Sequence, residues 1–245
     1  MLQLLLLAAV GFWAGAQNAL AGGGSFLTYP VLLFAGLDPR AANITSTVAL
    51  FPSQIAIAWT GWRTAEGVGR LGVRALVAIS LAGGAVGALL LLATPVAFFA
   101  RLLPWLMLFA TVVFAFGQKV RQRLPAGRHL PASALGAIQA GIAAYGGYFG
   151  AGIGFLMAAA LTLAGQGVRV AATTKNLLAA AMNAAAVLVF AFSGEARWPF
   201  ALALAVGSVA GGLAGGWLLL RIPERRLRLG IIGLGAVLTV WLFLR

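Results

Sequence analysis

A run without any charged residue extends from Leu130 to Val168, and a second extends from Ala75 to Ala100. A helix needs about 20 apolar residues to cross a bilayer, so the first run is too long for one span and must fold back. Only helices and closed barrels satisfy every backbone hydrogen bond in lipid. Strict alternation of apolar and polar residues is absent, and Ala and Leu are abundant. The pattern therefore predicts an all-α polytopic membrane protein.

The composition also favours a lipid environment. Hydrophobic residues make up 62% of the 245 positions and charged residues only 9%, with a mean hydropathy of +1.01. A water-soluble domain could not bury so much apolar surface. The net charge of +13 comes from 17 Lys and Arg against four acidic residues. Most of the basic residues lie between apolar runs, so we interpret them as a topology signal and expect no binding of nucleic acid.

The first half of the sequence recurs in the second half at a nearly constant offset. At 129 positions the matching pairs include Gly23 with Gly152, Phe26 with Phe155, Arg40 with Arg169 and Thr45 with Thr174. Near the end of each half the offset is 128, where Pro95 matches Pro223. We predict two transmembrane repeats of about five helical segments each, at 1–118 and 131–245, joined by a basic cytoplasmic linker at 119–130.

Ten helical segments follow from the apolar runs. They are 2–20, 25–36, 41–61, 72–93, 97–117, 131–149, 152–166, 169–192, 198–220 and 225–244. At ~1.5 Å per residue, 25–36 and 152–166 are shorter than the ~30 Å hydrocarbon core. They are half-helices, re-entrant pieces or spans shortened by a polar cavity, so we expect about eight to ten crossings. Segment 2–20 lacks the basic start of a signal peptide and is expected to be a retained helix.

Matching loops of the two halves carry opposite charge bias. Loop 62–74 has three Arg and one Glu, whereas its counterpart 193–198 has one of each. Loop 221–228 has four Arg and one Glu, whereas 93–101 has a single Arg. By the positive-inside rule, matching loops lie on opposite sides of the membrane. The halves are then inverted-topology repeats, an architecture of secondary transporters, with 62–74, 118–130 and 221–228 in the cytoplasm and both termini outside.

Each half places polar residues inside an apolar segment, shortly after a glycine-rich break. Unwound backbone at membrane depth is tolerated only around a cavity or inside protein, and a helix that restarts there presents N–H groups and a positive dipole end to an anion. The predicted substrate-binding residues are Lys175, Asn176, Thr174, Thr173, Thr45, Ser46, Thr47, Asn43, Gln54, Asn183, Gly23, Gly24 and Gly152. These residues predict glycine-broken helices around a site near the membrane midplane.

Lys175 is the ionisable residue of this set. It stands about 9 Å inside its segment at helical rise. Ionisable residues within a membrane are costly and usually face a bundle interior or a water-filled cavity. We predict that the Lys175 ammonium binds sulfite, sulfonate or carboxylate oxygens. The alternative is that its side chain extends to the interface and has no ligand.

Residues that support catalysis are scarce in this sequence. The four acidic residues lie in predicted loops or at segment ends, the single His129 lies in the basic linker, and there is no cysteine. A metal cage, a nucleophilic triad or an acid–base pair needs such residues in proximity. We therefore expect no enzymatic activity, no cofactor and no metal site.

The polar and glycine motifs resemble those of the TauE/SafE family of membrane transporters, often called sulfite exporters. The resemblance rests on Gly15, Gly22-Gly23-Gly24, Pro30, Gly36, Ala42, Thr45-Ser46, Gly150-Ala151-Gly152-Ile153-Gly154, Gly165 and Ala171 through Asn176. It implies a multi-pass protein of the bacterial inner membrane that moves small anions such as sulfite, sulfoacetate and other organosulfonates. We accordingly expect a secondary transporter that exports its substrate by alternating access of the two repeats. An anion channel with the same basic, glycine-lined site is the alternative.

Overall fold

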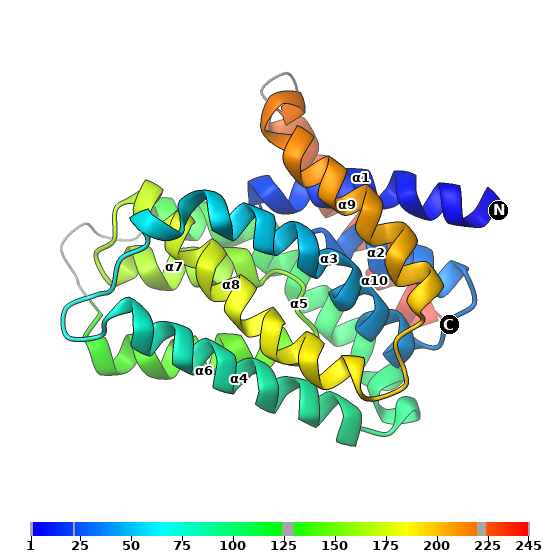
Figure 1. Ribbon diagram of the computed structural model, residues 1–245, viewed down its shortest axis with the longest axis horizontal. Coiled ribbons are helices and arrows are strands. Elements are labelled where there is room, and N and C mark those ends of the chain that lie inside the picture. Colours follow the sequence, from blue (N-terminus) through cyan, green and yellow to red (C-terminus); the bar gives the residue numbers. More distant parts are fainter. Residues whose placement is uncertain (1, 22, 124–129, 220–223, 245) are drawn as a thin grey trace.

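The computed structural model describes residues 2–21, 23–123, 130–219 and 224–244, and these form ten α-helices and one 3-10 turn (Figure 1). The helices are α1 (Leu2–Ala21), α2 (Ser25–Phe34), α3 (Pro39–Gly61), α4 (Val73–Ala93), α5 (Val96–Arg123), α6 (Ala132–Tyr148), α7 (Ile153–Leu163), α8 (Val168–Ala191), α9 (Trp198–Leu219) and α10 (Glu224–Leu244). The turn η1 (Trp62–Thr64) follows α3. Within the described ranges the only β pairing is a bridge between Val68 and Leu71. The prediction of an all-α protein is confirmed, and each predicted segment corresponds to one helix.

The two short helices, α2 and α7, end earlier than predicted and by the same motif. Gly36 has φ 90° and Gly165 has φ 98°, a left-handed conformation that stops a helix. The Leu37 N–H donates to the Leu32 carbonyl at 3.1 Å, and the Gln166 N–H donates to the Leu161 carbonyl at 3.0 Å. These six-residue closures satisfy the last carbonyls of each helix.

Helix α5 is longer than predicted. It continues to Arg123, six residues beyond the predicted end at 117 and into the predicted linker. Lys, Arg and Gln have high helix propensity, so charge alone was a poor signal for the end of this helix. The rest of the predicted linker, 124–129, lies outside the described residues, and the domain boundaries remain a prediction.

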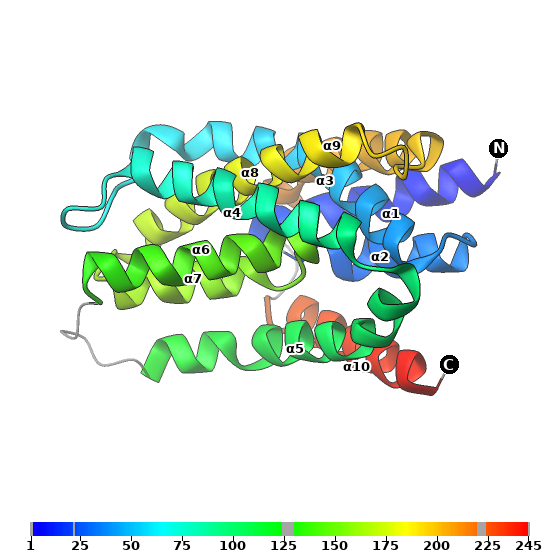
Figure 2. The same cartoon turned by 90° about the horizontal axis from the view of Figure 1, so that it is seen from below.

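The pairs α1–α2 and α6–α7 are hairpins that enter the helix bundle from opposite ends. The Leu130 N–H donates to the Leu163 carbonyl at 3.0 Å, so the end of α7 lies beside the start of α6 (Figure 2). Helix α1 starts, and α10 finishes, at the other end of the molecule (Figure 1). We call this the terminal end, and the end that carries residues 62–72 the loop end. Each hairpin turns inside the molecule at its glycine break, which favours the re-entrant interpretation of the short segments.

Four helices are long and apolar enough to cross a membrane. They are α3 with its 3-10 turn (Pro39–Thr64), α4, the Val96–Phe116 part of α5, and α8. The described parts of α1, α2, α7, α9 and α10 form shorter apolar helices. Large apolar side chains such as Phe34, Trp59 and Phe192 are exposed on the outside, as lipid contact requires. A multi-pass membrane protein is supported, and the number of full crossings remains a prediction.

Helix contacts follow a pattern that is unchanged when the two halves are exchanged. Helix α1 packs on α9, and its counterpart α6 packs on α4, the counterpart of α9. The α3–α9 contact likewise matches α8–α4, and α2–α3 matches α7–α8. Helices α3 and α8 also contact each other at the centre of the bundle. This arrangement supports the predicted duplication and places the polar stretches of both halves side by side.

Candidate functional site

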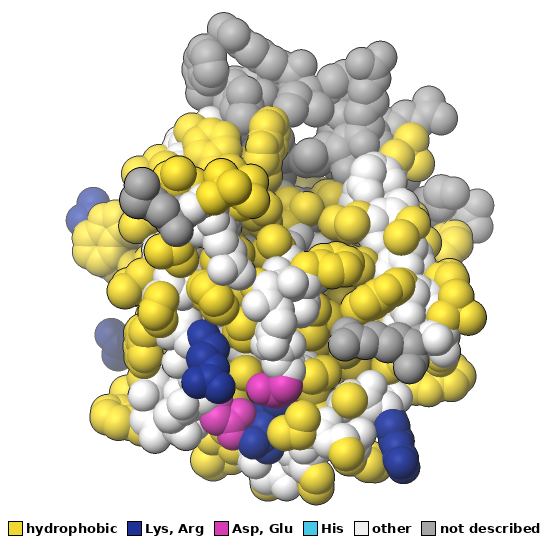
Figure 3. All heavy atoms as spheres, turned by 90° about the vertical axis from the view of Figure 1, so that its right-hand side faces the viewer, with side chains coloured by type: hydrophobic (Ala, Val, Ile, Leu, Met, Phe, Trp, Pro, Cys, Tyr) yellow, Lys and Arg dark blue, Asp and Glu magenta, His cyan; other side chains and the backbone are white. Residues whose placement is uncertain are grey.

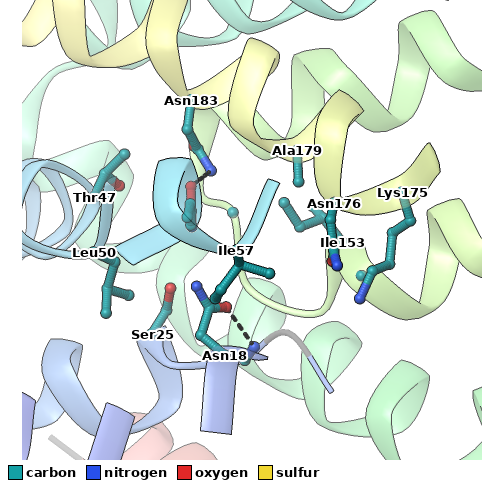
Figure 4. Close-up of a pocket in the computed structure, with 14 residues that line it drawn as sticks. Asn18, Ser25, Thr47, Leu50, Ile57, Ile153, Lys175, Asn176, Ala179 and Asn183 are labelled. Atoms are coloured by element: carbon teal, nitrogen blue, oxygen red, sulfur yellow. Dashed lines mark hydrogen bonds between the residues drawn. The ribbon is translucent and has the colours of Figure 1, made fainter. Parts of the chain in front are cut away.

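A small cavity of about 40 Å³ lies where the two hairpin turns meet helices α3 and α8 (Figure 4). Six of the predicted binding residues line it: Gly23, Thr47, Gln54, Lys175, Asn176 and Asn183. The lining of α3 recurs every three or four positions at Thr47, Leu50, Gln54 and Ile57, and that of α8 does so at Asn176, Ala179 and Asn183. One face of each helix therefore forms the wall of the pocket.

Lys175 supplies the positive charge of this pocket. It is the only charged residue among the described residues that line the cavity, and only 7% of its surface is exposed. Figure 4 shows its side chain directed into the same space as Asn176 and Asn18. A positive charge in a cavity of low dielectric attracts an anion more strongly than the same charge does in water.

Gln54 and Asn183 contact each other in the lining of the pocket. The Asn183 Nδ2 donates to the Gln54 Oε1 at 2.7 Å (Figure 4). The two residues are 129 positions apart, which is the offset of the sequence repeat. Equivalent residues of two copies can touch only near the axis that relates the copies. The contact therefore supports a pocket on the pseudo-twofold axis of the duplicated unit.

The glycine breaks bring backbone and first-turn residues of α2 and α7 to the pocket. Gly150 and Gly152 have φ near 80°, which favours glycine. The Gln17 Nε2 donates to the Gly23 carbonyl at 2.8 Å, and the Tyr145 hydroxyl donates to the Ala151 carbonyl at 2.9 Å. These bonds hold the unwound segments in place. The Phe26 and Leu27 N–H groups of α2 donate to the Gly23 and Gly24 carbonyls, and the Phe155 N–H of α7 donates to the Gly152 carbonyl. What both helices direct towards this region is therefore chiefly the positive end of the helix dipole.

Some pocket residues were not predicted. Asn18 closes the pocket from the end of α1, and its Oδ1 accepts from the Gly23 N–H at 3.4 Å. Ser25 and Gly154, which match each other at the repeat offset, begin α2 and α7 beside the cavity. The signal that could have found Ser25 is its position directly after the glycine break Gly22-Gly23-Gly24, where α2 begins. Nothing in the sequence around Asn18 shows that the end of α1 lies close to α3.

Thr45 and Thr174 were predicted to bind substrate but lie outside the pocket. The Thr45 Oγ1 accepts from the Arg197 N–H at 3.1 Å, and the Thr174 Oγ1 accepts from the Glu66 N–H at 3.1 Å. Each threonine therefore fastens the loop that follows the central helix of the other half. Both contacts are structural, although they are not strictly equivalent, because the residue that matches Glu66 at the repeat offset is Glu195 and not Arg197.

Five further predicted residues also lie outside the pocket. Asn43 Nδ2 donates to the Tyr148 carbonyl at 2.9 Å, and the Ser46 and Thr28 hydroxyls lie 2.6 Å apart. Thr173 donates to the carbonyl of Val170 at 2.9 Å. A Cβ at Gly24 would lie 2.8 Å from the Ala14 carbonyl oxygen, and one at Gly152 would lie 3.4 Å from Ala110. For Asn43, Ser46 and Thr173, which lie within α3 and α8, the physical reason is helical geometry, because successive residues point about 100° apart and only some can face one cavity.

The structural role of the two threonines can be tested by substitution. Thr45→Val and Thr174→Val each leave a loop N–H without its acceptor, so we expect a loss of about 1 kcal/mol in stability. Anion affinity should remain within about twofold of the parent, because neither side chain reaches the pocket. Thermal unfolding and anion titration of the purified protein would measure both. A large loss of anion affinity without a loss of stability would show that these two threonines take part in anion binding.

Comparison of the sequence with known proteins identifies the family of this chain. The sequence model of the family described as "Sulfite exporter TauE/SafE" matches residues 7–242. The chain belongs to the TauE/SafE family. Among similar TauE/SafE proteins, the probable membrane transporter protein YfcA of Escherichia coli K12 is 30% identical over 236 residues, which cover 94% of this chain and 86% of YfcA. A probable membrane transporter protein of Haemophilus influenzae is 29% identical over 218 residues, 86% of this chain and 83% of that protein.

A third relative, the probable membrane transporter protein ORF9 of a Sinorhizobium species, is 30% identical over 217 residues, 86% of this chain and 81% of ORF9. TauE/SafE membership and these names support a multi-pass membrane transporter, as the resemblance implied. The relatives are named as transporters and their names specify no substrate. The chemistry of the pocket must therefore guide the choice of substrate.

Proposed function

We propose that this chain is a secondary transporter of the bacterial inner membrane that exports small anions, such as sulfite or organosulfonates, by alternating access of two inverted repeats. The observation that carries the proposal is the pocket on the repeat axis, where one buried ammonium is surrounded by amides, hydroxyls and helix starts. Transporters with inverted repeats bind substrate near the midplane, between the repeats and beside broken helices.

The donors of the pocket suit an oxyanion. The Lys175 ammonium provides the charge, and the amides of Asn176 and Asn18 and the hydroxyl of Ser25, which also line the pocket, can donate hydrogen bonds (Figure 4). The N-termini of α2 and α7 add positive dipole ends, which favour sulfate-like and carboxylate groups in many proteins. Acidic residues are absent from the described lining, so nothing there repels an anion.

Size and charge narrow the substrate class further. A cavity needs roughly 10–15 Å³ of accessible space to hold one water molecule, so a cavity of about 40 Å³ holds a group of a few heavy atoms. A single ammonium balances a single negative charge. A divalent anion would leave one uncompensated charge in a pocket with low dielectric, which is costly. The pocket therefore favours small monovalent oxyanions, such as bisulfite or a short sulfonate.

The charge preference can be tested with two anions of similar shape. Methanesulfonate and sulfate are both tetrahedral, but the first is monovalent and the second divalent. At about a hundred times its Kd, a ligand that binds only the folded state adds ~2.7 kcal/mol of stability, so methanesulfonate should raise Tm by several degrees. Sulfate at the same ionic strength should raise it less. Taurine and sulfoacetate extend the series in size.

Two outcomes would contradict this assignment. Equal or stronger stabilisation by sulfate would show that one ammonium does not determine the charge selected. The absence of a shift with any sulfur oxyanion would remove the reason for an anionic substrate, although the transporter fold would stand. A separate experiment distinguishes a carrier from an anion channel. Counterflow of radiolabelled sulfite in proteoliposomes is expected only for a carrier, because only a carrier exchanges substrate across the membrane one molecule at a time.

The charges at the loop end support export from the cytoplasm. Arg63, Arg70, Arg74 and Arg169 lie in or beside the loops of this end, against the single acidic residue Glu66. A surface of one sign attracts ligands of the other sign and raises their local concentration. If the loop end faces the cytoplasm, as the positive-inside rule predicts, cytoplasmic anions are concentrated where they would enter the pocket.

A further inference from the structure

Two arginines and two glutamates occupy equivalent positions in the duplicated unit. Arg169 lies 129 positions after Arg40, and Glu195 lies 129 positions after Glu66. The arginines stand at the starts of the central helices α3 and α8, and the glutamates stand in the loops that follow these helices. The chain therefore carries the same arginine–glutamate set at both ends of the molecule.

At the terminal end this set forms an ion pair. The Arg40 Nε donates to the Glu195 Oε2 at 2.8 Å, and Arg40 Nη2 pairs with the other carboxylate oxygen, so the contact is bidentate. Arg40 Nη1 also donates to the Thr94 carbonyl at 2.9 Å. One guanidinium thus joins the start of α3, the end of α4 and the loop after α8. Figure 3 shows this face of the molecule, where acidic and basic side chains gather in one area and apolar side chains cover much of the rest.

At the loop end the equivalent pair is apart. Arg169 and Glu66 are both exposed, and the only ion pair among the described residues is Arg40–Glu195. The backbone at the loop end is nevertheless held across the two halves, because the Glu66 N–H donates to the Thr174 hydroxyl and the Glu66 carbonyl accepts from the Gln166 Nε2 at 2.6 Å. Arg40 lies five residues before Thr45, which holds the Arg197 N–H, and Arg169 lies five residues before Thr174, which holds the Glu66 N–H. Five residues span only ~7.5 Å along a helix, a distance that an arginine side chain can bridge.

We propose that Arg40–Glu195 and Arg169–Glu66 are exchanging gate pairs, of which one closes the terminal end and the other closes the loop end of the transport pathway. The proposal rests on the alternating access proposed above. Each pair joins one residue from each half, so a movement of the halves that brings one pair together can separate the other. The structure then represents the state in which the terminal-end pair is formed and the loop-end pair is not.

The energetics suit a reversible gate. The side chains of Arg40 and Glu195 are 17% and 27% exposed, which places the pair between a screened surface contact and a buried one. A bidentate arginine–carboxylate contact is specific in direction but can be broken at modest cost. Two pairs of the same chemistry leave the two states close in free energy, as a transporter that cycles between them requires.

A cysteine in the pocket can report which end is open. The chain contains no cysteine, so Ala179→Cys introduces a single thiol that lines the cavity without removing a proposed ligand. A membrane-impermeant maleimide is applied to intact cells and to inverted vesicles, and the side that labels slowly is identified for the parent. Arg40→Gln removes the terminal gate. It should raise labelling from the slow side about fivefold, because the minor state becomes more populated.

Matched variants separate a gate from a general loosening of the protein. Arg101→Gln removes another exposed arginine, placed at the start of α5, and should leave the slow rate unchanged. Arg169→Gln should lower the slow rate or leave it unchanged, and the exchanged pair Arg40→Glu with Glu195→Arg should restore the parent rate. An unchanged slow rate in Arg40→Gln, or an equal rise in Arg101→Gln, would overturn the proposal. The labelling experiment needs no substrate, so it tests the gate pairs independently of the transported anion. If the labelling rates change as expected but sulfite is not transported, only the proposed substrate is refuted.

Discussion

Replacing Lys175 with alanine is expected to lower the affinity for sulfite by about tenfold to a hundredfold. A hydrogen bond to a charged group is worth about 1.5–3 kcal/mol, and Lys175 is the only charged residue in the described lining of the pocket. The fold should survive, because the substitution removes a buried ammonium whose desolvation is costly. Titration of purified protein with sulfite, followed by thermal unfolding, would measure affinity and stability in one experiment.

Lys175→Arg is the matched control for this prediction. It keeps the charge but changes the shape of the donor, so affinity should fall less than in Lys175→Ala. If Lys175→Ala retains the parent affinity, the anion binds elsewhere and Lys175 only extends along the helix surface. If both variants lose affinity equally, the size of the ammonium and not its charge determines binding.

A large loss of stability is expected from Gly147→Ala. Helices α4 and α6 approach each other through glycines, and a Cβ at position 147 would overlap the carbonyl oxygen of Gly84 and lie 3.0 Å from its Cα. These are backbone atoms and cannot rotate away, so the helices must separate. Overpacking of this kind costs about 3 kcal/mol or more, which corresponds to a fall in Tm of ~6–12 °C. Thermal unfolding in detergent would measure the change.

Gly141→Ala provides a control in the same helix. A Cβ at position 141 meets no atom within 4 Å, and the residue is exposed. Alanine has the higher helix propensity, so this variant should keep or slightly raise the parent Tm, by up to about 1 kcal/mol of stability. A similar loss in both variants would mean that glycine is needed for flexibility of α6 and not for close packing against α4.

The helices could be predicted because their signals are local. Charge-free runs, glycine breaks and loop charges are properties of neighbouring residues, and they located all ten helices to within a few residues at most ends. The end of α5 was the exception, since a basic stretch is compatible with both a loop and an exposed helix. The repeat also followed from sequence, and the Gln54–Asn183 contact between equivalent positions supports it.

The pocket was only partly predictable. Lys175, Asn176 and Asn183 were selected because a polar side chain in an apolar membrane helix is costly unless it lines a cavity or has a polar partner. The structure places these three residues at the cavity. The same criterion also selected Thr45 and Thr174, which lie outside the cavity and accept hydrogen bonds from N–H groups of loop residues. A polar side chain in a membrane helix can bind a ligand or another part of the protein, and its residue type does not distinguish the two.

By itself, the sequence determined that this chain is a duplicated, all-helical membrane protein with one positive charge in its second polar stretch, because apolar length, glycine breaks and repeat offset are written along the chain. Only the tertiary structure decided which polar residues share a cavity, and that Arg40 meets Glu195 while Arg169 stays apart from Glu66. The physical reason is that these contacts join residues more than a hundred positions apart. They depend on how α3 and α8 cross and where the hairpins turn, which no local pattern specifies.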